Sequence, residues 1–115
     1  HLCRDSYTGM ALLLDRMAAT GKSLSAWRAE LPRYTRRSGK TRFEHGRLGV
    51  LMLAMEQLYP EASLDRTDGL KLLLDGAWIH LRASNTEPIL RVAVEAREKD
   101  RAEELFTAAM GVLRG

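Results

Sequence analysis

Two arginines enclose a short polar loop near residue 85 of this 115-residue chain. Between Arg82 and Arg91 lie Ser84, Asn85 and Thr86, whose hydroxyl and amide groups are short hydrogen-bond donors. A tight loop can also bend its backbone N–H groups into a concavity that holds an anion. Two guanidinium forks with such donors suit a tetrahedral phosphate dianion. Because no nucleophile stands beside a base, the pattern predicts a phosphate clamp with no catalytic residue and no metal ligand.

The same loop has a plainer interpretation. Ser, Asn and Thr before Pro88 are typical of a turn in which side chains bond their own backbone. An arginine at the end of a strand is usually a surface charge. An ordered turn would also hold a clamp in place, so the two interpretations are compatible. The spacing alone leaves both of them open.

The elements around the loop must bring the two arginines together. Residues 60–69 are expected to be a loop, and the leucines of 70–74 then alternate with period two. Asp75-Gly76 is a strong two-residue hairpin signal, which predicts a return strand over 77–82. A third strand is expected over 89–95. Antiparallel strands on either side of the polar loop would place both guanidinium groups at its mouth.

The remaining elements complete an α+β fold. Residues 33–44 are polar, basic and partly β-prone, which favours an edge strand, and 46–59 form an amphipathic helix that ends before Pro60. The last helix is expected over 100–113, with a capping-box-like start from Asp100 and Glu103. The order β-α-β-β-β-α predicts a small antiparallel sheet covered by helices on one face.

Two helices are predicted before this sheet, over residues 5–19 and 23–31. The first helix is apolar on more than one face, so it needs cover from another surface. We therefore divide the chain into residues 1–32, as the end of a preceding domain and its linker, and residues 33–115, as the C-terminal domain. Without that cover, residues 5–19 are expected to dock on their own domain or to self-associate.

Composition and charge limit the classes of function that this chain could have. The chain is 45% hydrophobic and 29% charged, and its net charge of +3 is concentrated between Arg28 and Arg47, where seven cations meet two acids. This basic run has two interpretations: a nucleic-acid footprint, or a solvated face that attracts a smaller anion. Against nucleic acid, no aromatic pair on a strand could stack bases. A protein-interaction domain that uses the apolar first helix is a further alternative.

The chain's setting is expected to be the cytoplasm. No apolar stretch reaches about 18 residues, so no membrane span is expected, and the start lacks the pattern of a signal peptide. The one cysteine, Cys3, is expected to be an unreactive thiol and fits a reducing compartment. The chain begins with His1 rather than Met, which we interpret as the start of an excised piece.

The segment RASNTEP, followed by ILRVAVEA, strongly resembles the C-terminal domain of the α-D-phosphohexomutases, the phosphoglucomutase and phosphomannomutase family. Three further segments are similar to this family: the hairpin from Asp68-Gly69 to Trp78, the junction from Gly21 to Tyr34, and the start from His1 to Asp5. The resemblance therefore spans nearly the whole chain.

The resemblance implies a role for this chain within a larger enzyme. Family members have four domains and interconvert hexose 1-phosphates and 6-phosphates through a bisphosphate intermediate. A phosphoserine and a Mg²⁺ site lie in the first two domains, the third reads the sugar hydroxyls, and the fourth grips the non-reacting phosphate. This chain would be the end of the third domain plus the fourth, inactive alone, with a sugar phosphate and the other domains as partners. Neither nucleic acid nor a membrane is expected as a partner, and the hexose is not identified.

The family's phosphate-binding residues fall on the predicted clamp: Arg82, Ser84, Asn85, Thr86 and, in many members, Arg91. In some members the second arginine stands two residues later, where this chain has Ala93.

Three neighbours of the clamp have expected roles of their own. His80 should point to the same side as Arg82, and we favour a packing role over a site role for it. Trp78 is expected to pack in the sheet and secondarily to brace Arg82. We interpret Glu87 as an orienting partner of Arg82 or Arg91, or as a plain surface charge.

Overall fold

The computed structural model of the chain describes residues 5–115, apart from the side chain of His45. Cys3 and the first four residues of the family resemblance lie outside the described residues. The chain divides into two compact units, His1–Arg33 and Tyr34–Gly115, which are described separately below. The assignment of the first unit to a preceding domain stays a prediction.

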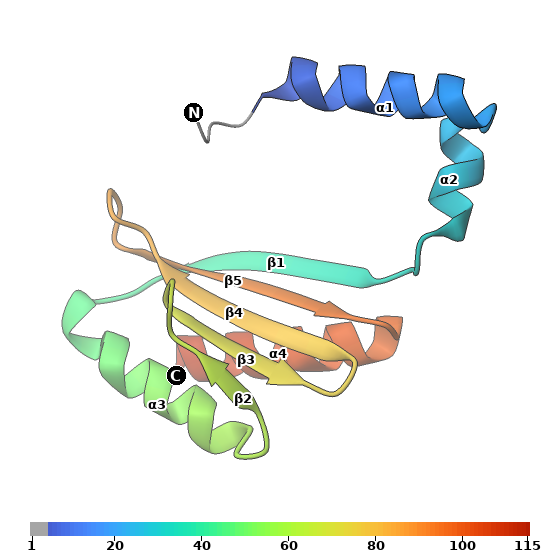
Figure 1. Cartoon of the computed structure of the whole chain (residues 1–115). Helices are drawn as coiled ribbons and strands as arrows, with labels where there is room; N and C mark the ends of the chain where they lie inside the picture. Colours follow the sequence, from blue (N-terminus) through green and yellow to red (C-terminus); the bar gives the residue numbers. More distant parts are fainter. Residues whose placement is uncertain (1–4) are drawn as a thin grey trace. The chain divides into compact units, whose positions relative to one another are not determined.

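The first unit contains two helices, α1 (Ser6–Thr20) and α2 (Leu24–Glu30) (Figure 1). The Asp5 carboxylate caps α1 by accepting two backbone N–H groups, and Gly21 ends that helix at a φ of 66°. The hydroxyl of Ser23 caps α2 by accepting the backbone N–H of Ala26. Both helices lie within the described residues, and neither buries a side chain. The exposed apolar residues of α1 are Tyr7, Met10, Leu12 and Leu14.

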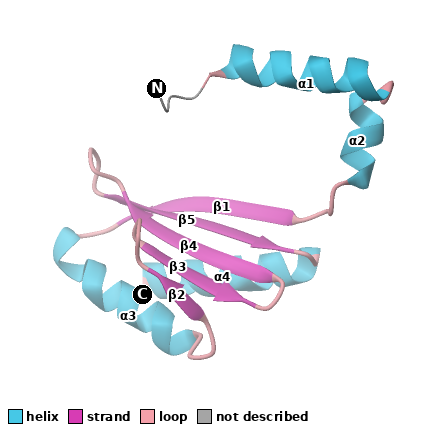
Figure 2. Cartoon of the chain, in the orientation of Figure 1, coloured by secondary structure: helices cyan, strands magenta, loops and turns pink. Residues whose placement is uncertain are grey.

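The second unit is an antiparallel sheet with helices on one face (Figure 2). Its described strands follow the order β1-β5-β4-β3-β2. Helices α3 (Leu48–Leu58) and α4 (Lys99–Arg114) lie on the same face of the sheet, and a 3₁₀ turn, His45–Arg47, precedes α3 (Figure 1). This confirms the predicted α+β class. The strands are β1 (Thr35–Arg42), β2 (Ser63–Asp65), β3 (Leu70–Leu74), β4 (Ala77–Ala83) and β5 (Ile89–Ala96).

The core lies between the sheet and the two helices. Period-two alternation on β3, β4 and β5 directs one set of side chains toward α3 and α4, as expected for a sheet covered on one face. The helices contribute the matching apolar stripes. The opposite set of strand side chains is therefore left for a site. The core comprises Leu51, Met55, Leu70, Leu72, Ile79, Leu81, Leu90, Val92, Val94, Leu105, Ala109, Met110 and Leu113.

Two sequence predictions about these elements were wrong. Part of the expected loop over 60–69 forms the short edge strand β2, which pairs with β3. The last helix does not begin with a capping box: its N-cap is Glu98, which makes no side-chain cap hydrogen bond. Glu103 is engaged elsewhere, because it accepts hydrogen bonds from Arg37 on β1.

Edge strand β1 is fastened to α4 at two points. The Arg37 guanidinium pairs with the Glu103 carboxylate, with a distance of 2.6 Å from Nε to Oε1. This hydrogen bond and charge lower the pKa of Glu103 and raise the pKa of Arg37. Gly39 faces the ring of Phe106, where an added Cβ would lie 2.8 Å from Cζ. Because alternate residues of β1 face α4, the intervening ones project from the open face of the sheet.

Candidate functional site

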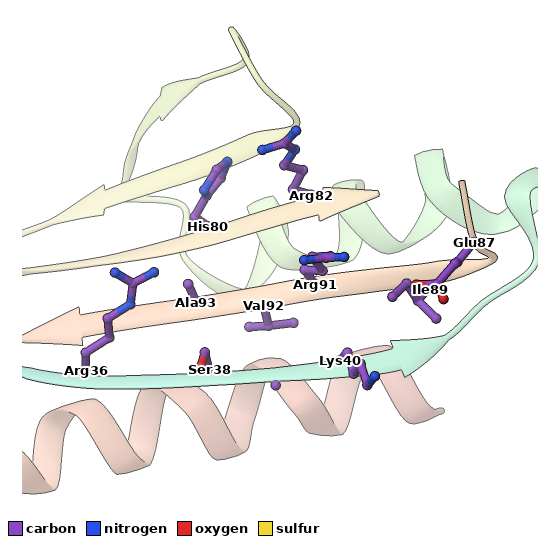
Figure 3. Close-up of a pocket in the computed structure, with 11 residues that line it drawn as sticks. Arg36, Ser38, Lys40, His80, Arg82, Glu87, Ile89, Arg91, Val92 and Ala93 are labelled. Carbon is purple, nitrogen blue, oxygen red and sulfur yellow. The ribbon is translucent and has the colours of Figure 1, made fainter. Parts of the chain in front are cut away.

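The open face of the sheet carries a groove of about 490 Å³. It lies across β1, β5 and β4, and Figure 3 shows the side chains that line it. Four of them are cations and come from all three strands. The lining residues are Arg36, Ser38, Gly39, Lys40, His80, Arg82, Glu87, Ile89, Arg91, Val92 and Ala93.

The strand register brings the two predicted arginines into direct opposition. Arg82 on β4 pairs with Arg91 on β5, as the sequence predicted for strands that flank the loop. Directly opposed residues of an antiparallel pair have Cβ atoms about 5 Å apart, so their side chains are neighbours. Like charges at this spacing repel each other, and the repulsion is relieved when an anion lies between them.

Asp68 holds two of the groove's side chains. Its carboxylate Oδ2 lies 3.2 Å from Nη1 of Arg82. Its backbone carbonyl lies 2.6 Å from Nε2 of His80 and accepts a hydrogen bond from that nitrogen. The sequence analysis assigned Asp68 only to the family resemblance. The signal that could have found it is the Asp-Gly pair before β3, since such a pair marks a tight turn.

The turn around Asp68 is built by local hydrogen bonds and one glycine. The N–H of Thr67 donates to Oδ1 of Asp65 over 2.9 Å. Hydrogen bonds from Thr67 lower the pKa of Asp65, and the nearby Lys71 and His80 lower it further. Gly69 has a φ of 83° and approaches β4 closely, so that an added Cβ would lie 2.2 Å from the carbonyl oxygen of Leu81. This close approach places Asp68 beside Arg82.

The polar loop is an ordered turn at the end of the groove. The N–H of Ser84 donates to the carbonyl of Ile89 over 2.9 Å, and the N–H of Thr86 donates to Oγ of Ser84 over 3.4 Å. This is the local bonding that the plainer interpretation expects. The structure does not place Ser84, Asn85 or Thr86 among the residues that line the groove. It brings Arg82 and Arg91 together and leaves the three loop residues beside them.

The structure can be compared with the roles predicted for three neighbours of the clamp, His80, Glu87 and Trp78. His80 lines the groove on the same side as Arg82, and the packing role favoured for it stays a prediction. Glu87 makes no ion pair among the described side chains, and Asp68 orients Arg82 in its place. Trp78 does not brace Arg82: its ring lies 5.8 Å from Cζ of Arg36 and 4.8 Å from Nζ of Lys71.

Part of the basic run and the two arginines of the predicted clamp meet in one groove. Arg36 and Lys40 of β1 line it together with Arg82 and Arg91. Sequence reasoning missed this because pairing between β1 and β5 joins residues that lie about fifty positions apart. On the open faces of β1, β4 and β5 the aromatic side chains are Trp78 and the imidazole of His80, both on β4. The residues that line the groove include no pair of Phe, Tyr or Trp rings that could stack bases.

Among the described side chains, which exclude that of His45, no group of three or more His, Cys, Asp or Glu is placed to hold a metal ion. Nor does any described helix combine the length and hydrophobicity that crossing a bilayer requires. The ionisable and polar side chains of the groove are its four cations, the imidazole of His80, the hydroxyl of Ser38 and the carboxylate of Glu87.

Comparisons with known proteins place the chain in a family. Residues 44–111 match the family model for the phosphoglucomutase/phosphomannomutase C-terminal domain. The chain is 32% identical over 113 residues to a phosphoglucomutase/phosphomannomutase of Thermococcus kodakarensis, which covers 97% of the chain and 25% of that relative. It is 30% identical over 116 residues to a probable phosphoglucosamine mutase of Methanopyrus kandleri, covering 99% of the chain and 26% of that relative.

A third relative, a phosphomannomutase of Methanocaldococcus jannaschii, is 31% identical over 97 residues, which cover 81% of the chain and 21% of that protein. The chain thus spans about a quarter of the length of the curated relatives that it matches. These relatives are named for three different sugars, so the likeness is to a domain that they share.

Proposed function

Since the chain belongs to the phosphoglucomutase/phosphomannomutase family, whose C-terminal domain it carries, we propose that its groove grips the phosphate group of a sugar phosphate. The observation that carries this proposal is the direct opposition of Arg82 and Arg91 at one end of the groove. Two guanidinium forks there can each donate two N–H groups to phosphate oxygens. The relatives' names support a mutase as the parent enzyme.

The groove binds one phosphate while the other end of the sugar reacts elsewhere. A phosphate has near-threefold symmetry about its ester bond, so one set of donors accepts the substrate in either orientation. Binding energy from this remote group then positions the reacting end. Asp68 prepares the groove because its carboxylate and its carbonyl fix Arg82 and His80 before the ligand arrives.

The loop residues contribute donors at the mouth of the groove. Ser84, Asn85 and Thr86 supply hydroxyl, amide and backbone N–H groups within a turn that is already ordered. A modest rearrangement of this turn would bring them onto the phosphate held by the arginines. Each charge-assisted hydrogen bond stabilises a bound anion by about 1.5–3 kcal/mol net.

The chemical step belongs to parts of the parent protein outside this chain. The family resemblance places a phosphoserine and Mg²⁺ there, and the described residues offer no group that fits the metal. Mg²⁺ would supply charge neutralisation at the transferring phosphoryl group. This chain alone is expected to bind phosphate with about millimolar affinity, because one wall of the site leaves the anion half in water.

Kinetics of the parent enzyme test the proposal. Arg82→Ala should lower kcat/KM by about 30- to 1,000-fold, since it removes one charged fork from the transition state. The matched control is Arg101→Ala, because Arg101 lies on α4, on the opposite side of the sheet, and pairs with Glu104. A kcat/KM within about threefold of the wild-type value for Arg82→Ala would contradict the proposal.

A further inference from the structure

We infer that Lys40, on edge strand β1, is a third phosphate-binding cation of the groove. The inference rests on the proposed function and adds to it a residue that lies outside the polar loop and its flanking strands. The ligand class is a phosphate monoester dianion. Three observations carry the inference: the strand register, the anchoring of β1, and the charge of the groove.

The register places Lys40 in one row with the two arginines. Lys40 on β1 lies directly opposite Arg91 on β5, and Arg91 lies directly opposite Arg82 on β4. Neighbouring strands are about 4.8 Å apart, so the row spans roughly 10 Å between its outer Cα positions. A lysine side chain can reach across one strand spacing toward an anion held above Arg91. Figure 3 shows Lys40 and Arg91 on adjacent strands within the groove.

The row is held in place from the other face of the sheet. Arg37, three residues before Lys40, is fastened to Glu103 of α4, and Gly39 packs against Phe106. These contacts hold Arg37 and Gly39 on the side of β1 that faces the helices. Because successive side chains of a strand point to opposite faces, Lys40 projects from the open face. Among the described side chains, neither Lys40 nor Arg91 forms an ion pair, whereas Arg82 is paired with Asp68.

The charge of the groove matches a dianion when Lys40 is included. The row of Lys40, Arg91 and Arg82 carries three positive charges against the one carboxylate that pairs with it, Asp68, which leaves a surplus of two. A phosphate monoester carries about −1.5 to −2 charges at neutral pH. Three cations side by side destabilise the free sheet through mutual repulsion, and a bound dianion removes that cost. Phosphate binding therefore explains a positive charge at position 40 of the edge strand.

A matched pair of variants separates a direct contact from general attraction. Arg42 stands two residues beyond Lys40 on the same strand and the same face, is exposed, and does not line the groove. Lys40→Met and Arg42→Met remove the same charge about 7 Å apart along the strand. The probe is inorganic phosphate, titrated by NMR into the 115-residue chain and its variants at constant ionic strength.

Lys40→Met should weaken phosphate binding about tenfold, as expected for the loss of one partly solvated charge-assisted hydrogen bond. Arg42→Met should weaken it less than about twofold, because an exposed charge that does not contact the phosphate acts on it only through water and is weakened further by salt. Equal effects of the two variants would overturn the inference, because they would show that Lys40 attracts phosphate only through its charge and not through a direct contact. Unchanged amide spectra away from β1 confirm that both variants keep the fold.

Arg82→Ala in the same titration distinguishes the two proposals. If Arg82→Ala abolishes binding and Lys40→Met has no effect, the role of Lys40 is refuted while the phosphate groove stands. If Arg82→Ala leaves the affinity unchanged, the proposed function itself fails. The expected pattern is a large loss for Arg82→Ala, about a tenfold loss for Lys40→Met and little change for Arg42→Met.

Discussion

Replacing Gly69 by alanine tests how the turn beside β4 prepares the groove. Gly69 and Gly76 both have positive φ values, 83° and 65°. An alanine in the left-handed region costs about 1–2 kcal/mol, and this cost applies to both positions. At Gly76 an added Cβ would lie 3.8 Å from Cδ of Arg97, which is an ordinary contact. Gly76→Ala should therefore lower the free energy of unfolding by that conformational cost alone.

Gly69→Ala should cost considerably more. Its Cβ would lie 2.2 Å from the carbonyl oxygen of Leu81 and 3.2 Å from Cα of Arg82. Carbon atoms prefer separations of about 3.5–4.0 Å, and the obstacle is backbone rather than a flexible side chain. Either the turn or β4 must move by more than about 1 Å, so we expect a loss of at least 3 kcal/mol.

The assay is urea unfolding of the wild type and the glycine variants, followed by far-UV circular dichroism. Gly111→Ala is the positive control: Gly111 lies on α4 with no atom near its added Cβ, so this variant should be more stable by about 0.5–1 kcal/mol. Gly69→Ala should also bind phosphate more weakly under conditions in which it is folded, because Asp68 moves away from Arg82. A Gly69→Ala variant as stable as Gly76→Ala would refute the reasoning.

Three further outcomes follow from the structure. Glu103→Gln should destabilise the chain at neutral pH. Because Arg37 lowers the pKa of Glu103, the difference in stability from the wild type should disappear as the pH falls through that lowered pKa. A difference in urea unfolding that does not change with pH would contradict this. The double variant Leu12→Gln, Leu14→Gln should abolish any concentration-dependent association seen by sedimentation velocity, since these leucines are two of the large exposed apolar side chains of α1. Phosphate binding should weaken only gradually with added salt, whereas a nucleic-acid site would give a steep slope in a matched oligonucleotide titration.

Local patterns predicted the part of the fold that depends on neighbouring residues. Period-two alternation and the Asp75-Gly76 turn located β3 and β4, and the turn formed as expected, with Gly76 at a φ of 65°. The strands on either side of the polar loop gave the opposition of Arg82 and Arg91, because a hairpin register follows from the loop between its strands.

The missed features depend on contacts between distant segments. Strand β2 has three residues, too few to show a period, and it exists because β3 offers an edge to pair with. Glu103, for which a capping role was expected, instead accepts a hydrogen bond from Arg37, which lies 66 positions away in the sequence. The same kind of long-range pairing brings Lys40 to Arg91. The spacing of residues in the sequence does not reveal such a pairing, so the part of the groove that β1 contributes could be found only from the fold.

The measurement that tests the central claim most directly is the map of amide shifts when the ¹⁵N-labelled chain is titrated with a hexose 1-phosphate. The account predicts that the shifts cluster on the row of Lys40, Arg91 and Arg82 and on the loop from Ser84 to Thr86, with about millimolar affinity. Shifts that spread along β1 past Arg42 and spare the loop, or shifts confined to the helical face of the sheet, would contradict it.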